Sequence, residues 1–543
     1  MVSRFVRRVR TDSGAVAVQV VTKQGQQILD IDHVGSARTD GELALLLQTA
    51  ADRLRPGQEM LDLGDVRPAP ARMGAIADFT AARPEATSVQ PADDDETSVG
   101  RAVSALAGRS GARVVSTSSL VLWRTLVEAY SRIGLDVLGD ESFRAMVLAR
   151  IVEPTSKADS LRVLAGLGAP CPDRSSLFRA LKRSQNKGYR GRIATVLAGF
   201  SSRAGRLGAV VMYDVTTLHF EISDEDEGDR GLRKVGMSKE HRVDPQVQVG
   251  LLVDPSGFPL EAHLFEGNTA ETKTIIPVLE AFQKRHGISD LVVVADAGML
   301  SAGNLNAIED AGFSFIVGSR IVKAPYDLAE HFEAHGDFFT DGQVLESTRT
   351  MGQGKAARSR RVVYQWRFAR SKRDNKNINA MIAKAEKIAA GDAPVSRTRF
   401  LKIVGETREL NQETVDRARQ LAGLKGYVTN LDKTVMAGPA LIHAYHDLWK
   451  VEASFRMTKS DLRARPIFHH TRDAIEAHLT VVLAALAVSR DLQERSGASI
   501  KKIIQTLREA RSATIEINRQ QVTLDPELSP AAHDLLHRLR NGH

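Results

Sequence analysis

The pattern of apolar and polar residues changes character several times along the chain. Near the start, segments 15–21 and 27–32 alternate like short strands, and segment 40–54 has the apolar spacing of a helix. These elements predict a small β-rich module over residues 1–66. Residues 67–116 are rich in Pro, Ala, Thr and Asp, which is typical of a linker.

Residues 117–205 carry apolar residues at helical spacing. A short basic helix predicted over 173–183 follows a turn that contains Gly and Pro, and with the preceding helix it has the outline of a helix-turn-helix motif. We therefore predict a helical DNA-binding domain in which four residues face a groove: Arg174, Ser176, Arg179 and Lys182. The alternative is an ordinary helical bundle with a basic exposed face.

From residue 208 the pattern changes to short apolar strands between polar loops. Three antiparallel strands, followed by alternating helices and strands, predict the first part of an RNase H-like α/β core over residues 206–324. The predicted strands are 208–214, 217–222, 247–253 and 260–265, followed by 291–295 and 313–318.

The regular alternation stops after residue 324. Residues 325–436 predict a β-rich insertion, crossed by one lysine-rich helix. Helical spacing returns at 437–490, which we assign to the second part of the core, and 491–543 predict a C-terminal helical region. The expected fold class is thus multidomain α+β, with an RNase H-like core interrupted by a β-rich insertion.

Composition narrows the setting of the protein. The chain has 543 residues, of which 43% are hydrophobic, so it can bury large cores. The longest apolar run is too short for a membrane span, and we expect the N-terminal segment not to be a signal peptide. Cys171 is the single cysteine, which excludes an internal disulfide and a cysteine-based zinc site. We expect a cytoplasmic protein, associated with the nucleoid of a bacterial cytosol and not with a membrane.

The net charge of +8 is only weak evidence for a polyanionic partner, but its distribution is informative. Residues 355–376 contain nine Lys and Arg residues and a single acid, Asp374, and Tyr364, Trp366 and Phe368 alternate in the middle of this segment. Such a basic aromatic segment suits phosphate contact and base stacking. We predict DNA contacts from Arg358, Arg360, Arg361 and Trp366. The alternative is a surface hairpin with a solvated charged face.

Three acids lie in settings that suggest a common site. Asp214 and Asp296 each follow a buried strand, and Glu452 lies in a helical segment. A carboxylate at a buried strand end is costly unless a positive group holds it. Oxygen ligands shared between two hard cations would serve in-line phosphodiester chemistry. Each acid also has an ordinary structural explanation: a turn cap, a loop acid, or an ion pair with Arg456.

Sequence around these acids resembles a known family. Tyr445, Glu452 and Lys459 have the spacing of the Tyr-Arg-Glu-Lys signature of insertion-sequence DDE transposases, in the superfamily named after insertion sequence four. Leu448 occupies the arginine position, and Arg456 is a candidate substitute. Other similar segments are Asp-Val-Thr-Thr-Leu-His-Phe at 214–220 and Ala-Asp-Ala-Gly at 295–298. The resemblance covers roughly residues 120–490.

The resemblance implies a mechanism and partners. Asp214, Asp296 and Glu452 would bind two Mg²⁺ ions, with Mn²⁺ as an alternative, and Tyr445 and Lys459 would hold phosphates near the cut. Trp449 and Trp366 would be available to stack on an unpaired base, although core packing is the more ordinary role for Trp449. A homodimer would hold paired transposon ends, cleave the double-stranded DNA at terminal inverted repeats and transfer the 3′-hydroxyl ends to target DNA.

Two rival functions stay open at this point. A domesticated, catalytically inactive regulator would bind the same DNA without cutting it. An RNase H-like nuclease would cut without transferring strands.

Overall fold

The computed structural model describes residues 2–10, 16–24, 27–37, 46, 113–221, 225–226, 231–236, 244–270, 273–288, 290–296, 301–319, 328–394, 399–404, 407–517 and 520–542. The chain divides into two compact units. One combines Met1–Gln90 with Ile378–Val415, and the other combines Pro91–Asn377 with Asp416–His543.

The first unit contains two small sheets. Its N-terminal sheet has the antiparallel order β1-β2-β3, and Val18 and Val20 form its buried centre with Val6, Val34 and Leu46 against them. A separate hairpin pairs β12 with β13. The bounds are β1 (Val2–Arg10), β2 (Val16–Gln24), β3 (Gln27–Ala37), β12 (Leu401–Val404) and β13 (Thr407–Leu410). The helix predicted at 40–54 lies outside the described residues, apart from residue 46.

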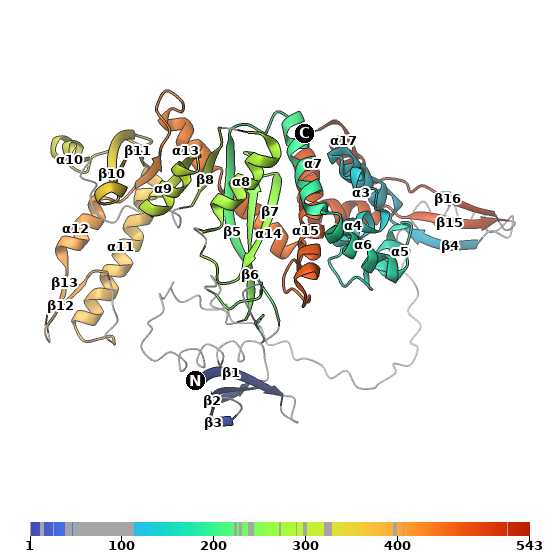
Figure 1. The fold of residues 1–543 in the computed structure, drawn as a ribbon, viewed down its shortest axis with the longest axis horizontal. Helices are drawn as coiled ribbons and strands as arrows, with labels where there is room; N and C mark the ends of the chain where they lie inside the picture. Colours follow the sequence, from blue (N-terminus) through green and yellow to red (C-terminus); the bar gives the residue numbers. More distant parts are fainter. Residues whose placement is uncertain are drawn as a thin grey trace, which may run out of the picture. The chain divides into compact units, whose positions relative to one another are not determined.

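The second unit is built on an eight-stranded sheet of order β10-β11-β14-β9-β8-β5-β6-β7 (Figure 1). β5 pairs antiparallel with β6, and β6 with β7, whereas β5, β8 and β9 are parallel. The bounds are β5 (Val210–His219), β6 (Gln246–Val253), β7 (Pro259–Glu266), β8 (Val292–Ala295), β9 (Ser314–Ser319), β10 (Val344–Met351), β11 (Arg358–Trp366) and β14 (Leu424–Thr429). The predicted mixture of α and β structure is confirmed.

Strand β5 differs from the sequence prediction of two strands, 208–214 and 217–222. It runs unbroken from Val210 to His219 because the β-branched residues after Asp214 continue the ladder with β6. Asp214 pairs with Leu251 in that ladder. The acid therefore lies in the middle of the strand and not at its end.

The predicted insertion at 325–436 is also organised differently from the expectation. β14 pairs antiparallel with β9, and β11 and β10 follow, so three strands of this region extend the central sheet. β14 thereby covers an edge that β9 would otherwise expose. The helices of this region are α10 (Ala329–His335), α11 (Phe368–Ala389) and α12 (Gln412–Gln420).

Helices cover both faces of the sheet. One face packs on α8 (Ile275–His286) and α9 (Ala302–Asp310), through Phe282, Leu305 and Ile308. The opposite face packs on α13 (Gly438–His446), α14 (Trp449–Ser460) and α15 (Arg472–Ser496). Both faces of the central strands are therefore shielded from solvent, which explains why β6 is buried along its whole length.

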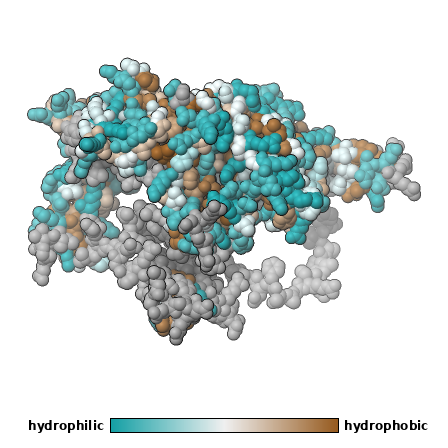
Figure 2. Space-filling view, in the orientation of Figure 1, coloured by the Kyte–Doolittle hydropathy of each residue, from teal (hydrophilic) through white to brown (hydrophobic). Residues whose placement is uncertain are grey.

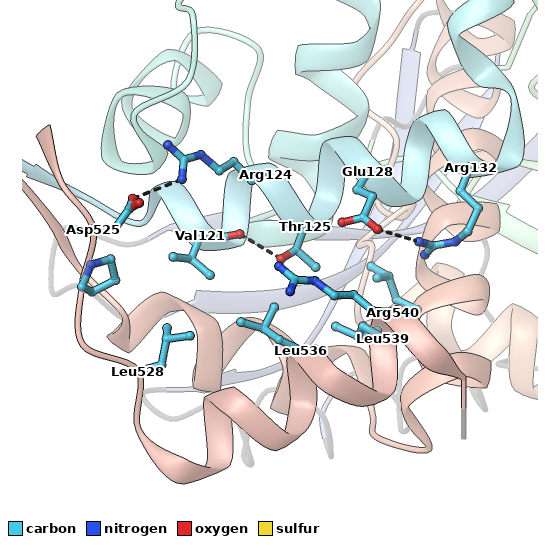
Figure 3. A pocket seen from close by; sticks show the side chains of 12 residues that line it. Val121, Arg124, Thr125, Glu128, Arg132, Asp525, Leu528, Leu536, Leu539 and Arg540 are labelled. Atoms are coloured by element: carbon cyan, nitrogen blue, oxygen red, sulfur yellow. Dashed lines mark hydrogen bonds and ion pairs between the residues drawn. The ribbon is translucent and has the colours of Figure 1, made fainter.

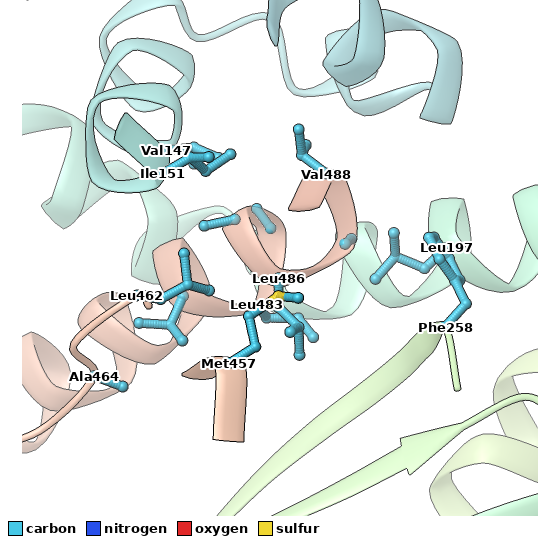
Figure 4. Packing of buried hydrophobic residues seen from close by; sticks show 14 of the residues in the cluster. Val147, Ile151, Leu197, Phe258, Met457, Leu462, Ala464, Leu483, Leu486 and Val488 are labelled. Atoms are coloured by element: carbon cyan, nitrogen blue, oxygen red, sulfur yellow. The ribbon is translucent and has the colours of Figure 1, made fainter. Parts of the chain in front are cut away.

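Helix α15 is the centre of the helical layer. Residues 479–488 are buried on every side of this helix, as expected for its most apolar stretch. Figure 4 shows residues of α4, α7 and α14, together with Phe258, gathered around Leu483 and Leu486. The layer consists of α3 (Leu120–Ile133), α4 (Glu141–Val152), α5 (Ser160–Leu167), α6 (Arg174–Asn186), α7 (Tyr189–Arg203), α15, α16 (Ile500–Glu509) and α17 (Pro530–Asn541). The region predicted as a helical domain at 117–205 thus shares one core with α15.

The C-terminal region is not wholly helical, contrary to the prediction for 491–543. It contains the hairpin of β15 (Ser512–Ile517) and β16 (Gln520–Leu524), in which apolar and polar residues alternate. β15 also pairs with β4 (Arg113–Ser118), so the end of the segment predicted as a linker is a strand. The rest of that predicted linker lies outside the described residues.

The surface carries few large apolar patches on the face shown in Figure 2, where hydrophilic residues predominate and hydrophobic ones are scattered. Within the described part of the chain, we find no helix that combines the length and apolarity needed to cross a membrane.

Candidate active site

The register of two neighbouring strands brings two acids together. Along the parallel pair β5 and β8, Val210 lies opposite Val292, and Met212 lies opposite Val294. Continued by two residues, this register puts Asp214 beside Asp296. Neighbouring strands are about 4.8 Å apart, so this register predicts that the two residues are close neighbours.

Both acids belong to the sheet face that α13, α14 and α15 cover. Side chains alternate along a strand, and Met212 and Val294, each two residues before an acid, lie in the core beneath these helices. Tyr213 and Ala295 lie in the core on the opposite face. Asp214 is half-buried and Asp296 is exposed, so the pair opens toward solvent at the edge of this core.

Tyr445, on α13, contacts the second acid. Its hydroxyl donates a hydrogen bond of 3.1 Å to Asp296 Oδ1. The side chain fits because Gly318 on β9 has no Cβ, which would lie only 2.3 Å from the tyrosine oxygen. Burial raises the pKa of Tyr445, and the charges of Asp296 and Glu452 raise it further. The tyrosine is thus a neutral donor between the sheet acid and the helix acid.

Glu452 lies in the first turn of α14, where the helix dipole favours a negative charge. The helix is anchored on the sheet side by Val451 and Phe455, which are buried, and it packs against β5 and β6. Glu452 itself is exposed. This position leaves its carboxylate free of the core, on the same side of the molecule as Tyr445.

The three acids do not form a closed ion site in this conformation. In the described ranges, no three or more His, Cys, Asp or Glu side chains are close enough together to hold a metal ion. Carboxylate oxygens are the ligands that hard divalent cations prefer, so the chemistry of the predicted ligands fits such an ion. The sheet fixes two of them, whereas the third depends on how α14 packs.

The segment 445–459 is not one continuous helix, contrary to the sequence prediction. The helical hydrogen-bond pattern is interrupted at residues 447–448, between α13 and α14, where Leu448 N donates to Tyr445 O. Tyr445 and Lys459 therefore do not share one helix face with Glu452 by simple two-turn spacing. Lys459 is half-buried in the last turn of α14, and Arg456 is exposed.

Two tryptophans behave opposite to expectation. Trp449, for which we expected core packing, is 60% exposed at the start of α14. Trp366 is instead fixed in the structure: its indole N–H donates to Ala422 O at 3.0 Å, and its ring stacks on Phe339. The Trp449 ring is therefore accessible from solvent, whereas the Trp366 ring is held by these contacts.

The basic segment at 355–376 is divided between a strand and a helix. Arg360 is fully buried and binds Glu309 and Asn306, so it has no access to DNA, contrary to the prediction. Arg358 pairs with Glu309 and Asp310, and Arg361 pairs with Glu346. Arg358 and Arg360 lie on one face of β11 and Arg361 on the other, and each is paired with a neighbouring acid.

Helix α6 presents the residues predicted to face a DNA groove. Asp173 caps its start, and Arg174, Arg179 and Lys182 are exposed, whereas Ser176 is half-buried and accepts a bond from Arg179. The other face of α6 packs on α4, α7 and α15. Sequence reasoning missed Phe178, which is 47% exposed and lies beneath the cations of Arg174 and Lys157.

A further residue that the sequence did not single out lies beside the acids. Lys425 on β14 places Nζ 4.4 Å from the ring centroid of Tyr445. It lines a cavity of about 330 Å³ with Arg367, Arg370 and Arg373. Three of these cations belong to the basic segment that we noticed, but Lys425 reaches them only through the pairing of β14 with β11.

A different cavity lies between α3 and α17, with leucines on one wall and Arg124 paired to Asp525 at its mouth (Figure 3). Its volume is about 200 Å³. It is formed by helices outside the part of the sheet that carries the acids, so we do not assign it to the active site.

Comparison with known proteins identifies the family of this site. The family model described as the transposase DDE domain matches residues 209–488, a little over half of the 543-residue chain. No curated protein matched the chain. Domains of this family depend on divalent metal ions, so the carboxylates described above fit the family's chemistry.

Two solved transposase structures are similar to the chain at low identity. One is a cryo-EM structure of the piggyBac transposase synaptic complex with hairpin DNA, at 9% identity and a TM-score of 0.33, covering 68% of this chain and 70% of that chain. The other is a Mos1 transposase paired-end complex with the left transposon end, at 12% identity and a TM-score of 0.15, covering 30% and 54%. The family match, which includes Asp214, Asp296 and Glu452, carries the assignment: the chain belongs to the transposase DDE domain family.

Proposed function

We propose that this transposase binds the terminal inverted repeats of an insertion sequence, cleaves DNA at both ends and transfers the 3′-hydroxyl ends to target DNA. The observation that supports this proposal is the register of β5 and β8, which, continued by two residues, would bring Asp214 beside Asp296. We further propose that the core is RNase H-like. The order β7-β6-β5-β8-β9, antiparallel and then parallel, supports this assignment.

The three acids would bind two divalent cations, and Mg²⁺ is the ion we propose. Bound there, the ions would generate a nucleophile from water or a 3′-hydroxyl and stabilise the leaving oxygen. Tyr445 holds the Asp296 carboxylate through its hydroxyl, and Lys459 and Arg456 extend from the same helix as Glu452. The exposed Trp449 is available to stack on an unpaired base at the cut end.

DNA binding would extend over the helical layer. The exposed basic residues of α6, with Phe178 between two cations, form a surface suited to phosphates and base edges. Both ends must be processed together, so we propose a homodimer that holds paired ends. Within the superfamily named after insertion sequence four, the spacing of Tyr445, Glu452 and Lys459 supports membership of the Tyr-Arg-Glu-Lys signature class.

The test uses the full chain, Mg²⁺, a labelled duplex with the element's own terminal sequence, and a target plasmid. We expect strand cleavage at the end and labelled products joined to the plasmid. Binding without cleavage would favour the inactive regulator and contradict the proposal. Cleavage without joined products would favour a nuclease that lacks strand transfer.

A further inference from the structure

A basic pocket lies on the insertion side of the candidate active site. It has a volume of about 330 Å³ and forms where β11 passes into α11, next to β14 and the end of α13. Its functional lining consists of Arg367, Arg370, Arg373, Lys425, Tyr427 and His446. The pocket brings together three segments that are distant in the sequence.

The charge of the pocket is strongly unbalanced. Four of its lining residues are basic, and Asp341 is the lining carboxylate, which accepts a hydrogen bond from Phe368 N at 2.8 Å. Arg370 lies 3.5 Å from Asp374, but its Nε is buried without a hydrogen-bond partner among the described residues. The pocket therefore has the electrostatics of an anion site.

The pocket is connected to the acids by aromatic contacts. Lys425 Nζ lies over the ring of Tyr445, whose hydroxyl binds Asp296. Tyr427 packs edge-on against Tyr445 at 5.0 Å and bonds His446 at 3.1 Å. Burial lowers the pKa of Lys425, as do Arg370 and Arg373, whereas Asp296 raises it. A bound anion would relieve this mutual repulsion of the cations.

Leu448 occupies a signature position at which the resembled family has an arginine, and this suggests a role for the pocket. The signature that the chain resembles has an arginine there, but Leu448 is 7% exposed and packs in the core, so it cannot contact a phosphate. Of the pocket's cations, Lys425 lies over the ring of Tyr445, three residues before this position. Arg370 and Arg373 line the same pocket as Lys425. Positive charge that position 448 lacks is thus present on β14 and α11.

We propose that this pocket binds a phosphodiester of the DNA strand that is cleaved near Asp296. Lys425, Arg370 and Arg373 would then make the phosphate contacts that Leu448 cannot make. The inference rests on the proposed function. Arginine forks match phosphate oxygens in pairs, and Lys425 adds a point charge next to Tyr445. The bound phosphate would hold the strand in register with the carboxylates.

The experiment compares the variants Lys425→Met and Arg373→Ala with Lys372→Ala and Lys376→Ala. The last two remove exposed cations from the same helix α11 that do not line the pocket. Each lost phosphate contact should reduce the slope of log affinity against log salt by about 1. We expect this reduction, with at least tenfold slower cleavage, in the first pair at unchanged thermal stability. Equal effects in both pairs would overturn the proposal.

Single methylphosphonate substitutions along the cut strand provide the second measurement. One neutral linkage near the cut should weaken binding by the wild type, and the same linkage should have little further effect on Lys425→Met. Identical profiles for the two proteins would overturn the pocket assignment while leaving cleavage by the wild type intact. Absence of both binding and cleavage by the wild type would instead contradict the proposed function itself.

Discussion

The sheet and the helix contribute to the candidate site in different ways. Asp214 and Asp296 are placed by backbone register, which allows their side chains little freedom of position. Glu452 is exposed on a helix whose place depends on packing, and a break at residues 447–448 separates that helix from Tyr445. We therefore expect one half of the candidate site to be preformed and the other half to be adjustable.

This difference has an energetic basis. Sliding one strand past another breaks a whole ladder of hydrogen bonds and moves its side chains to the wrong face. Shifting a helix on an apolar surface keeps its internal bonds and exchanges one set of van der Waals contacts for another. We therefore expect assembly of the full ion site to involve α14 and not the strands.

Replacement of the acids by alanine should have the largest effect. We expect Asp214→Ala, Asp296→Ala and Glu452→Ala each to reduce cleavage by roughly 10⁴-fold or more, the range found when essential catalytic groups are removed. The comparison adds a distinction: Glu452→Ala should retain binding of one Mn²⁺, measured by electron paramagnetic resonance, whereas Asp214→Ala should lose it. Equal Mn²⁺ binding in the two variants would show that the sheet pair is not preformed.

Loosening α14 should have the next largest effect. Phe455 is buried beneath the helix, and Phe455→Ala should lower the free energy of unfolding by about 3–5 kcal/mol, measured by urea denaturation. Phe468→Ala is the matched control, because Phe468 is 68% exposed and should change stability by less than about 0.5 kcal/mol. A small loss for Phe455→Ala would mean that the helix is held by something other than its apolar face.

A larger side chain at the contact between β9 and α13 should lower stability by a smaller amount. Gly318→Ala would place a Cβ against the Tyr445 hydroxyl and should lower stability by about 1–3 kcal/mol and slow cleavage. Gly303→Ala serves as the control, since a Cβ there meets nothing within 4 Å. Unchanged cleavage in Gly318→Ala would show that Tyr445 need not touch Asp296.

Lowering the pH should lower the free energy of unfolding, because two partly buried histidines must take up protons. Burial lowers the pKa of His469 to about 4, with Lys157, Arg150 and His470 adding to the effect, and burial also lowers the pKa of His478. The unfolded chain therefore binds more protons below about pH 6.5, so stability is highest above that pH and falls as pH decreases. We expect a loss of roughly 1–2 kcal/mol between pH 7 and pH 5.

The measurement is urea denaturation across this pH range. His469→Gln should flatten the decline, whereas His533→Gln, which changes an exposed histidine of α17, should leave it unaltered. A decline that is identical in wild type and His469→Gln would exclude this histidine as a cause.

The smallest expected effect comes from Tyr445→Phe. It removes the hydrogen bond to Asp296 but retains the ring, so stability should change by about 1 kcal/mol. Cleavage should slow by roughly tenfold if the bond positions the carboxylate, the equivalent of about 1.4 kcal/mol. Wild-type cleavage rates in this variant would assign Tyr445 a packing role alone.

Sequence reasoning identified the elements that carry the three acids, because apolar strands and amphipathic helices have distinct periods. It did not predict that β5 is continuous through Asp214, since pairing with β6 decided that outcome. It assigned Arg360 to the surface because an ion pair with Glu309, 51 residues away, has no local signal. Lys425 was missed for the same reason: its neighbours are set by strand order and not by spacing.

The pairing of β4 with β15 has a consequence for synthesis of the protein. Arg511 and Thr117, which bond at this junction, are 394 residues apart. A ribosome extends the chain from the N-terminus. β4 and the apolar faces of α3 to α7 therefore lack their packing partners until α15 and β15 have been synthesised. The helical layer can close only after β15 has emerged from the ribosome. Until then, the apolar faces of α3 to α7 would be exposed to chaperones.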